Sequence, residues 1–178
     1  MSADPQPEVT LRVWSDGDLP LLIRIMGEPE MTVYLGGPES LEKIRERHLR
    51  YCQLQPADKG QMFVILVGRE QTAAGSVGYW SRTWRDEIVW ETGWSVLPEF
   101  QGQGIASRAT AAVVERARAV GTHRFIHAFP KIENAASNAV CRKAGFTMVE
   151  PGVAFEYPPG HPIRCNDWRI DLFPNADT

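Results

Sequence analysis

The sequence predicts a single α/β (α+β) domain built on a mixed, mostly antiparallel sheet flanked by helices. Apolar runs of strand length alternate with amphipathic stretches of helical spacing. Short turns join the central strand candidates, and no repeat or low-complexity linker divides the chain. The 178 residues are enough for one domain with a sizeable core.

The first half of the chain predicts a strand, two helices and a meander of three strands. Residues 1–8 read as a flexible tail, so the domain is expected to span residues 9–175. The expected elements are a strand at Val9–Trp14, helices at Asp16–Met26 and Glu39–Gln53, and strands at Met62–Val67, Gly75–Trp84 and Asp86–Val96. Because a short turn at Gln71–Ala74 joins the first two strands of the meander, we expect them to pair antiparallel.

The second half predicts two helices and three further strands. The expected elements are a glycine-bearing loop at Pro98–Gly104, a helix at Ile105–Val120, a strand at Arg124–Phe129, a helix at Glu133–Lys143, and strands at Thr147–Tyr157 and Ile163–Phe173. The connection through the first of these helices is long enough to return the chain as a parallel strand. The sheet is therefore expected to be mixed.

Composition excludes several classes of protein. A net charge of −3 and a pI near 5.8 argue against a nucleic-acid binder, which needs a basic surface. No apolar run reaches the roughly 18 residues of a membrane span, and the N-terminus lacks a secretion signal. The three cysteines form no CxxC pair, so we expect neither a metal site nor a disulfide framework. The expected location is the cytoplasm.

The most informative segment is VLPEFQGQGIAS, at residues 96–107. An apolar strand ends there, two glycines follow, and an alanine-rich helix begins. Glycines let backbone N–H groups converge, and a helix N-terminus adds unpaired donors and a positive dipole end. This combination predicts a cradle for a phosphate-bearing ligand.

Three kinds of ligand could use such a cradle. A P-loop needs a lysine that this segment lacks. A dinucleotide fingerprint needs GxGxxG or GxGxxA, but residues 102–107 read GQGIAS and follow an antiparallel meander. The strand RFIHAF also lacks the acidic residue that contacts a ribose. The remaining option is coenzyme A.

These residues resemble the GNAT superfamily of N-acetyltransferases. The family pattern [Q/R]-x-x-G-x-[G/A] appears as QGQGIA at residues 101–106. A second pattern, N-x-x-[S/A] followed by a helix and G-F, appears as NAAS at residues 134–137 and then Gly145-Phe146. The approach ETGWSVLP at residues 91–98 looks like the ribosomal-protein, RimJ/RimL-like branch. The order of elements is similar along nearly the whole chain.

The resemblance implies a GNAT fold whose sheet is splayed between the strand ending at Val96 and the strand Arg124–Phe129, with acetyl-CoA in the gap. Strand edges exposed by the splay would bind the pantetheine arm, and the glycine loop would hold the pyrophosphate. The implied cofactor contacts are Trp94, Ser95, Val96, Gln101, Gly102, Gln103, Gly104, Ile105, Ala106, Ser107, Asn134, Ser137, Asn138 and Cys141. Asn134 could equally be a helix N-cap.

Two residues are candidates for catalysis. Glu91 lies in the middle of a central strand, where a charge is costly unless it is used or paired. It could take the proton of the attacking amine, or it could form an internal salt bridge with Arg82 or Arg85. Many relatives carry a tyrosine where this sequence has Cys141, whose thiol is a weak donor and could be a packing residue. Ser137 is therefore the candidate general acid for the leaving thiolate.

The resemblance implies an acetyl-CoA-dependent N-acetyltransferase that acts on a primary amine by direct attack in a ternary complex. The acceptor could be a small-molecule amine or a protein N-terminus. Its pocket is expected to involve Met31–Leu35 with Tyr34, the strand residues Trp80, Trp84 and Glu91, and the last hairpin at Phe155–Asp167. His127, a lone histidine in a strand, is expected to be structural. A catalytically silent CoA-binding sensor and a dinucleotide-binding protein are the alternatives. A homodimer is common in this family, but the sequence does not fix the oligomeric state.

Overall fold

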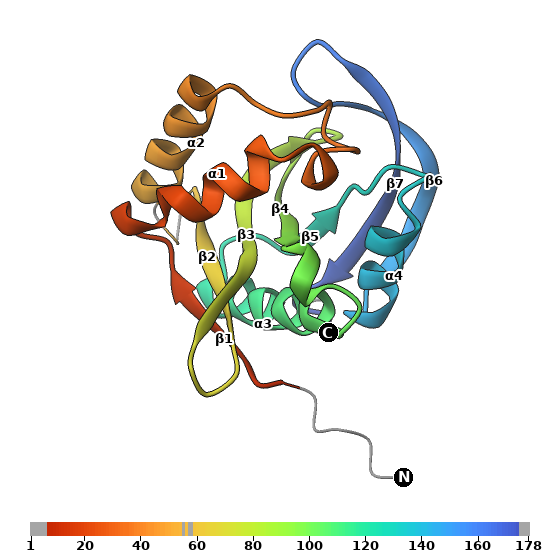
Figure 1. The fold of residues 1–178 in the computed structure, drawn as a ribbon. Helices are drawn as coiled ribbons and strands as arrows, with labels where there is room; N and C mark the ends of the chain where they lie inside the picture. Colours follow the sequence, from red (N-terminus) through yellow and green to blue (C-terminus); the bar gives the residue numbers. More distant parts are fainter. Residues whose placement is uncertain (1–6, 55, 57–58, 175–178) are drawn as a thin grey trace, which may run out of the picture.

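The computed structural model describes residues 7–54, 56 and 59–174. Most of the predicted tail and the predicted domain end at residue 175 therefore lie outside the described part. Within it, seven strands form one sheet in the order β1-β2-β3-β4-β5-β7-β6, and the strands pair antiparallel except for β4 with β5 (Figure 1). The predicted mixed, mostly antiparallel sheet is confirmed. No helix in the described residues is long and apolar enough to cross a membrane.

The elements follow the predicted order. They are β1 (Val9–Val13), α1 (Leu19–Gly27), α2 (Leu41–Gln53), β2 (Gly60–Val67), β3 (Thr72–Trp84), β4 (Glu87–Val96), α3 (Ile105–Val120), β5 (Phe125–Ala128), α4 (Ala135–Lys143), β6 (Thr147–Glu156) and β7 (Pro162–Asp171). Short 3-10 turns lie at Asp16–Asp18, Pro29–Met31 and Pro98–Phe100.

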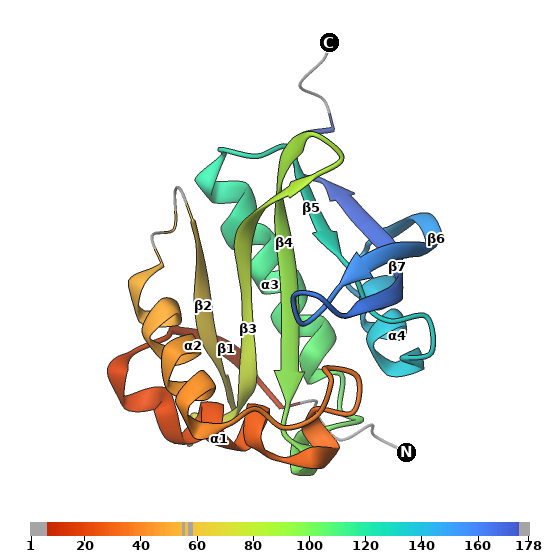
Figure 2. The same cartoon turned by 90° about the horizontal axis from the view of Figure 1, so that it is seen from above.

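Helices cover both faces of the sheet (Figure 2). α3 and α4 lie on one face, and α1 and α2 lie on the other. Alternation along β2 explains how both faces are filled, because Phe63 and Ile65 pack toward α3 whereas Met62 and Val64 pack toward α1 and α2. Each fully buried large apolar side chain contributes about 1.5–3 kcal/mol relative to an exposed one. The two helical layers therefore hold the sheet from both sides.

The sheet opens between β4 and β5. These parallel strands pair only at Trp90 with Ile126 and at Glu91 with His127, whereas β4 stays paired with β3 as far as Val96. Within the described residues, the β5-facing edge of β4 beyond Glu91 thus has no strand partner. Such an edge offers unpaired backbone donors and acceptors to an extended ligand. The splay implied by the family resemblance is present.

Some predicted boundaries were wrong for local reasons. The first helix begins at Leu19 rather than Asp16, because Asp16–Asp18 forms a separate 3-10 turn held by the Asp18 carboxylate and Ser15. The second begins at Leu41, where the Ser40 hydroxyl accepts from the Lys43 N–H at 3.3 Å. The predicted turn at Gln71–Ala74 lies earlier, since the Gln71 N–H donates to the Gly68 carbonyl and Thr72 already belongs to β3.

Candidate active site

Two adjoining cavities open at the splay between β4 and β5. The cavity beside the glycine loop, here called the loop cavity, has a volume of about 530 Å³ and is lined by residues 101–107 apart from Gln103. The second, here called the sheet cavity, has a volume of about 250 Å³ and lies against β4 and the end of β5. Residues that line both are Tyr34, Leu35, Trp94, Ser95, Asn134 and Ser137. The cavities therefore meet at the end of β4.

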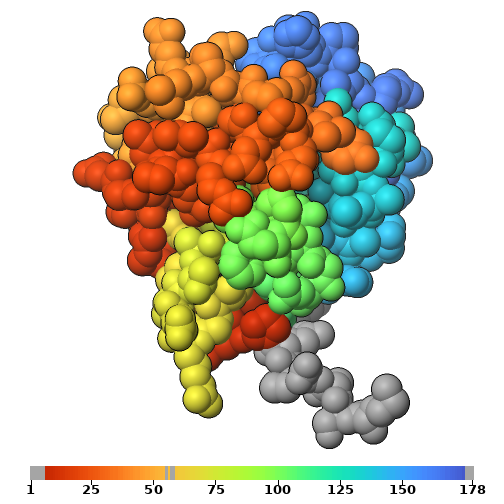
Figure 3. All heavy atoms as spheres, viewed as in Figure 1, coloured from red at the N-terminus to blue at the C-terminus, as the bar shows by residue number. Residues whose placement is uncertain are grey.

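Three chain segments that are far apart in sequence form the mouth of the loop cavity. The turn after α1, the glycine loop and α4 lie side by side on one face of the molecule, coloured orange, green and cyan (Figure 3). Met31 and Phe100 come from the first two of these segments, and Val140 comes from the third. The ligand-sized opening is thus a product of the tertiary fold rather than of the loop alone.

The glycine loop has the conformation that a phosphate cradle requires. Gly102 and Gly104 have φ of 75° and 70°, a left-handed conformation that a side chain strains, and an added Cβ at either would face open space. Gly104 is the N-cap of the sixteen-residue α3, so the unpaired N–H groups of its first turn are oriented toward the loop cavity. This end of the cavity suits an anion.

Side chains support the loop from outside. The Gln101 amide donates to the Val96 carbonyl at 2.9 Å, whereas Gln103 lines neither cavity. The Arg108 guanidinium donates to the carbonyls of Gln103 and Gly104 at 3.0 and 3.3 Å. Arg108 was not predicted, although an arginine one turn into the helix after a glycine loop is a recognisable signal. It fixes the loop and adds positive charge beside it.

The start of α4 brings two of the predicted residues to the junction of the cavities. The Asn134 side-chain oxygen accepts from the Ser137 N–H at 3.0 Å, so Asn134 is the N-cap of the helix. Both residues line both cavities. The N-cap role that the sequence left open is present, and the exposed part of each side chain remains available to a ligand.

Asn138 and Cys141 lie elsewhere. The Asn138 amide donates to the carbonyls of Lys131 and Asn134, and its oxygen accepts from Asn166 and Trp168. Cys141 is fully buried in the main core, and burial raises the pKa of its thiol to about 12. Neither residue lines a cavity, because both are on the face of α4 that packs against the sheet.

Glu91 lies in the sheet cavity with its side chain 13% exposed. Its Oε2 accepts from Arg82 Nη1 at 2.9 Å, so the salt bridge that the sequence left open is present. Burial raises the pKa of Glu91 above its usual range even though Arg82 favours the charged form. The guanidinium of Arg82 lies 4.2 Å from the ring centre of Phe155, which holds it against β6. A carboxyl group with a raised pKa thus lines the cavity.

A buried histidine–aspartate pair lies directly beside Glu91. His127 Nδ1 and Asp167 Oδ1 are 2.6 Å apart, and the indole of Trp84 donates to Asp167 Oδ2 at 3.0 Å. Trp84 therefore lines neither cavity, in contrast to its predicted place in the acceptor pocket. The polar run from Arg164 to Asp167 stands out within β7 in the sequence, but the sequence gives it no partner.

Aromatic and basic side chains complete the sheet cavity. Trp80 and Tyr34 line it as predicted, and Trp80 leaves no room for a side chain at Gly93, where a Cβ would lie 2.9 Å from its ring. Tyr157 and Ile163, from the predicted last hairpin, line it too, whereas sequence reasoning missed Arg47, Tyr51, Phe129 and Lys131. Most of these lie on elements that only the fold brings together, so no local pattern identified them.

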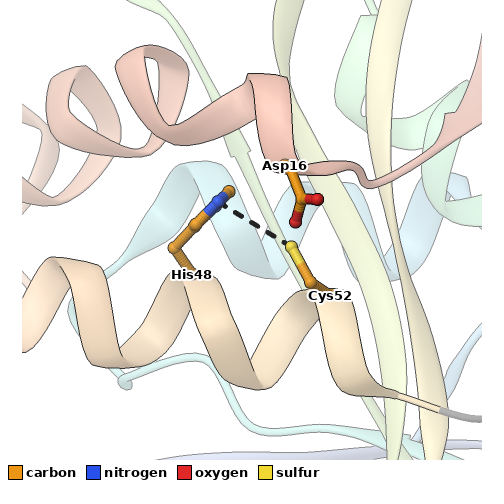
Figure 4. Close-up of side chains that lie close together, drawn as sticks. All are labelled: Asp16, His48 and Cys52. Atoms are coloured by element: carbon orange, nitrogen blue, oxygen red, sulfur yellow. Dashed lines mark hydrogen bonds between the residues drawn. The ribbon is translucent and has the colours of Figure 1, made fainter.

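A cluster of Asp16, His48 and Cys52 lies outside both cavities (Figure 4). The indole of Trp14 donates to His48 Nδ1 at 3.1 Å, which places the ring proton on Nε2, 3.8 Å from the Cys52 sulfur. Because a protonated Nε2 has no lone pair for a cation, the cluster is a hydrogen-bonded link between α2 and the chain after β1. Burial and the neighbouring Asp16 carboxylate raise the pKa of the Cys52 thiol.

Comparison with known proteins identifies the family. The acetyltransferase (GNAT) domain family matches residues 8–147, so the chain belongs to the GNAT acetyltransferases. No curated protein matches the chain in sequence.

Solved structures share the fold at low sequence identity. A spermidine N-acetyltransferase from Vibrio cholerae, in complex with CoA and spermine, is 17% identical over 92% of this chain and 95% of its own, with a TM-score of 0.74. An aminoglycoside acetyltransferase in complex with coenzyme A is 16% identical over 96% and 100%, with a TM-score of 0.75. An acetyltransferase from Salmonella typhimurium that modifies the N-terminal serine of a 50S ribosomal subunit protein is 21% identical over 92% and 94%, with a TM-score of 0.70.

Proposed function

We propose that this protein transfers an acetyl group from acetyl-CoA to a primary amine by direct attack in a ternary complex. The observation that carries the proposal is the meeting of the two cavities at Ser95, Asn134 and Ser137. One cavity has the donors that a pyrophosphate needs, and the other has a buried carboxylate. A donor and an acceptor bound in them would meet at the end of β4.

The loop cavity fits coenzyme A. N–H groups of the glycine loop and of the first turn of α3 would bind the pyrophosphate, with Ser107 and Arg108 beside them. The free edge of β4 from Trp94 to Val96 would bind the pantetheine arm through its backbone, and Asn134 would contact the arm by its amide. Acetyl-CoA supplies the acetyl group as an activated thioester.

Glu91 is the residue that we assign to the amine proton. It lies on β4 two residues from Gly93, which also lines the sheet cavity, so a bound amine can reach the carboxylate directly or through one water. Ser137 is placed at the junction of the cavities, where its hydroxyl could donate to the leaving thiolate. Cys141 is too deeply buried to carry the acyl group.

The acceptor class includes both small amines and protein N-termini. Of the structurally similar proteins, two act on small amines and one modifies the N-terminus of a ribosomal protein. Membership in the RimJ/RimL-like branch, a cytoplasmic location and a homodimer remain part of this proposal. They rest on the ETGWSVLP segment and on what is common in the family.

A thermal-shift titration with acetyl-CoA, CoA and NADH tests the cofactor assignment. A ligand present at 100 times its Kd and bound only to the folded state adds about 2.7 kcal/mol of stability, which raises Tm by several degrees. Stabilisation by acetyl-CoA and CoA but not NADH supports the proposal. Free thiol release with an amine library then separates an enzyme from a silent CoA-binding protein. Absence of any shift with acetyl-CoA, in folded protein, would refute the cofactor assignment.

A further inference from the structure

The sheet cavity has no spare negative charge. Among its described lining residues, Glu91 is the one carboxylate, and Arg82 already neutralises it at 2.9 Å. Two cations, Arg47 and Lys131, line the same cavity. The ammonium groups of an acceptor with several positive charges would therefore lose their hydration on binding. The cavity has no further carboxylates whose contacts could replace the lost water.

Lys131 brings an uncompensated positive charge. It follows β5, where its backbone carbonyl accepts from the Asn138 amide and its main chain bridges to Cys165. Its side chain is half-buried and forms no ion pair with any residue that the structure describes. A lysine that lines a cavity without a carboxylate partner favours an anionic ligand.

Arg47 brings a second donor group to the cavity. Its Nε and Nη2 bind the Glu39 carboxylate, and Nη2 also donates to the Tyr157 hydroxyl at 3.2 Å. Tyr51, which also lines the cavity, is a further partner of the guanidinium. The guanidinium is thus fixed in orientation by α2 and the turn between β6 and β7, and it adds a second basic group to the wall of the cavity.

Aromatic side chains form much of the remaining wall, and the space is small. The aromatic lining residues are Tyr34, Tyr51, Trp80, Trp94, Phe129 and Tyr157. The volume of about 250 Å³ is below the roughly 300–1,000 Å³ of pockets that take drug-sized ligands. The body of the acceptor is therefore compact and apolar or aromatic.

We infer that the acceptor is an amino-acid-like amine, with one amino group, one acidic group and a compact apolar or aromatic body. Its acidic group binds Lys131 in the part of the molecule where Arg47 adds positive charge, and its amino group lies near Glu91. This inference rests on the proposed acetyl transfer. The amine nitrogen forms a bond to the acetyl carbon and loses a proton to Glu91, while the carbon–sulfur bond breaks and its electron pair leaves on the thiolate, which is then protonated to free CoA.

Matched pairs of amines test the inference. Phenylalanine and tyrosine are compared with phenethylamine and tyramine, which lack the carboxylate, and with spermidine, by measuring thiol release and kcat/KM. Because a charge-assisted hydrogen bond is made only by the acids, we expect the amino acids to be favoured by about tenfold or more. The Lys131→Gln variant should lose most of this preference. Lys43→Gln removes the same charge from the exposed side of α2 and should leave the preference unchanged.

A binding measurement gives the same test without turnover. In the presence of CoA, N-acetylphenylalanine should stabilise the wild-type protein more than N-acetylphenethylamine, and Lys131→Gln should abolish the difference. Equal or better turnover of the decarboxylated amines or of spermidine would overturn the inference and leave acetyl transfer standing. So would an equal loss of kcat/KM for acids and non-acids in Lys131→Gln. If acetyl-CoA gave no thermal shift and no amine released thiol, both proposals would fall.

Discussion

His127 and Asp167 form a buried hydrogen-bonded pair whose side chains are 4% and 1% exposed; His127 lies on β5 opposite Glu91, and Asp167 lies on the next strand, β7. Asp167 binds two donors at once, the imidazole of His127 and the indole of Trp84. Asp167 thereby fixes two rings, the imidazole of His127 on β5 and the indole of Trp84 at the end of β3. It therefore holds β5 and β7 in place at the position where β4 separates from β5.

Replacing Asp167 by asparagine tests this structural role. An asparagine has one acceptor oxygen for the Trp84 indole and one donor nitrogen toward His127, so His127 must either change tautomer or leave its Nδ1–H without a partner. A buried donor without a partner costs about 1–3 kcal/mol, and urea unfolding should show a loss of that size. Asp171→Asn, which removes an exposed salt bridge on the same strand, is the matched control and should change the unfolding midpoint little. Equal stability of the two variants would contradict the role.

The raised pKa of Glu91 predicts the pH dependence of turnover. A general base must be deprotonated, so kcat/KM should rise with pH through a pKa that lies above the usual range of glutamate. Glu91→Gln should lower kcat/KM by about a hundredfold or more and remove this acidic limb. Glu87→Gln, an exposed position on the same strand, should leave both unchanged. A Glu91→Gln enzyme with an intact acidic limb would show that another group accepts the proton.

The sequence predicted the fold well, because periodicity and turn chemistry are local properties. The glycines at 102 and 104 also located the loop cavity, whereas the splay was expected from the family resemblance. Which side chains of α4 face the cavity could not be predicted from the local sequence. Asn138 and Cys141, three residues apart, share the face that packs on the sheet, whereas Ala136 and Val140 face the cavity. Only packing decides between these two faces.

Long-range contacts account for the other missed residues. Arg47 and Tyr157 are 110 residues apart and meet because the turn between β6 and β7 lies against α2. Nothing in KIRERHLR distinguishes Arg47 from its basic neighbours. Trp84 was placed in the acceptor pocket because it is a large aromatic residue near the end of β3. A buried aspartate 83 residues later binds it instead.

Gly104, the left-handed glycine at the start of α3, should affect both the stability of the protein and its binding of acetyl-CoA. A second left-handed glycine at the other end of the helix allows the two effects to be separated. Gly104→Ala places a Cβ at φ 70°, which costs about 1–2 kcal/mol, and shifts the loop whose N–H groups would bind the pyrophosphate. We expect lower stability and weaker stabilisation by acetyl-CoA. Gly121→Ala has the same strain at φ 75° at the other end of α3, and should lose stability only. A normal acetyl-CoA shift in Gly104→Ala would argue against the loop as the anion site.

The three cysteines should differ sharply in reactivity. Cys141 and Cys165 are fully buried, and burial raises their pKa to about 12 and about 11, so neither forms a thiolate near neutral pH. A thiol reagent at pH 8 should label Cys52 alone in the native protein, slowly because its pKa is also raised, and all three after unfolding. Mass spectrometry of the labelled peptides measures this.

The Cys141→Ala variant tests whether Cys141 carries the acetyl group during the reaction. A buried thiol with so high a pKa cannot act as an acyl-carrying nucleophile, so this variant should retain kcat and show no burst of thiol release that differs from wild type. The substitution should instead lower the free energy of unfolding, because it truncates a side chain in the core cluster that also contains Phe146 and Trp168. If native Cys141 were labelled by the reagent, or by the acetyl group of acetyl-CoA, direct attack by the amine would no longer describe the reaction. The relative order of labelling, with Cys52 first, therefore bears on the mechanism as well as on the packing.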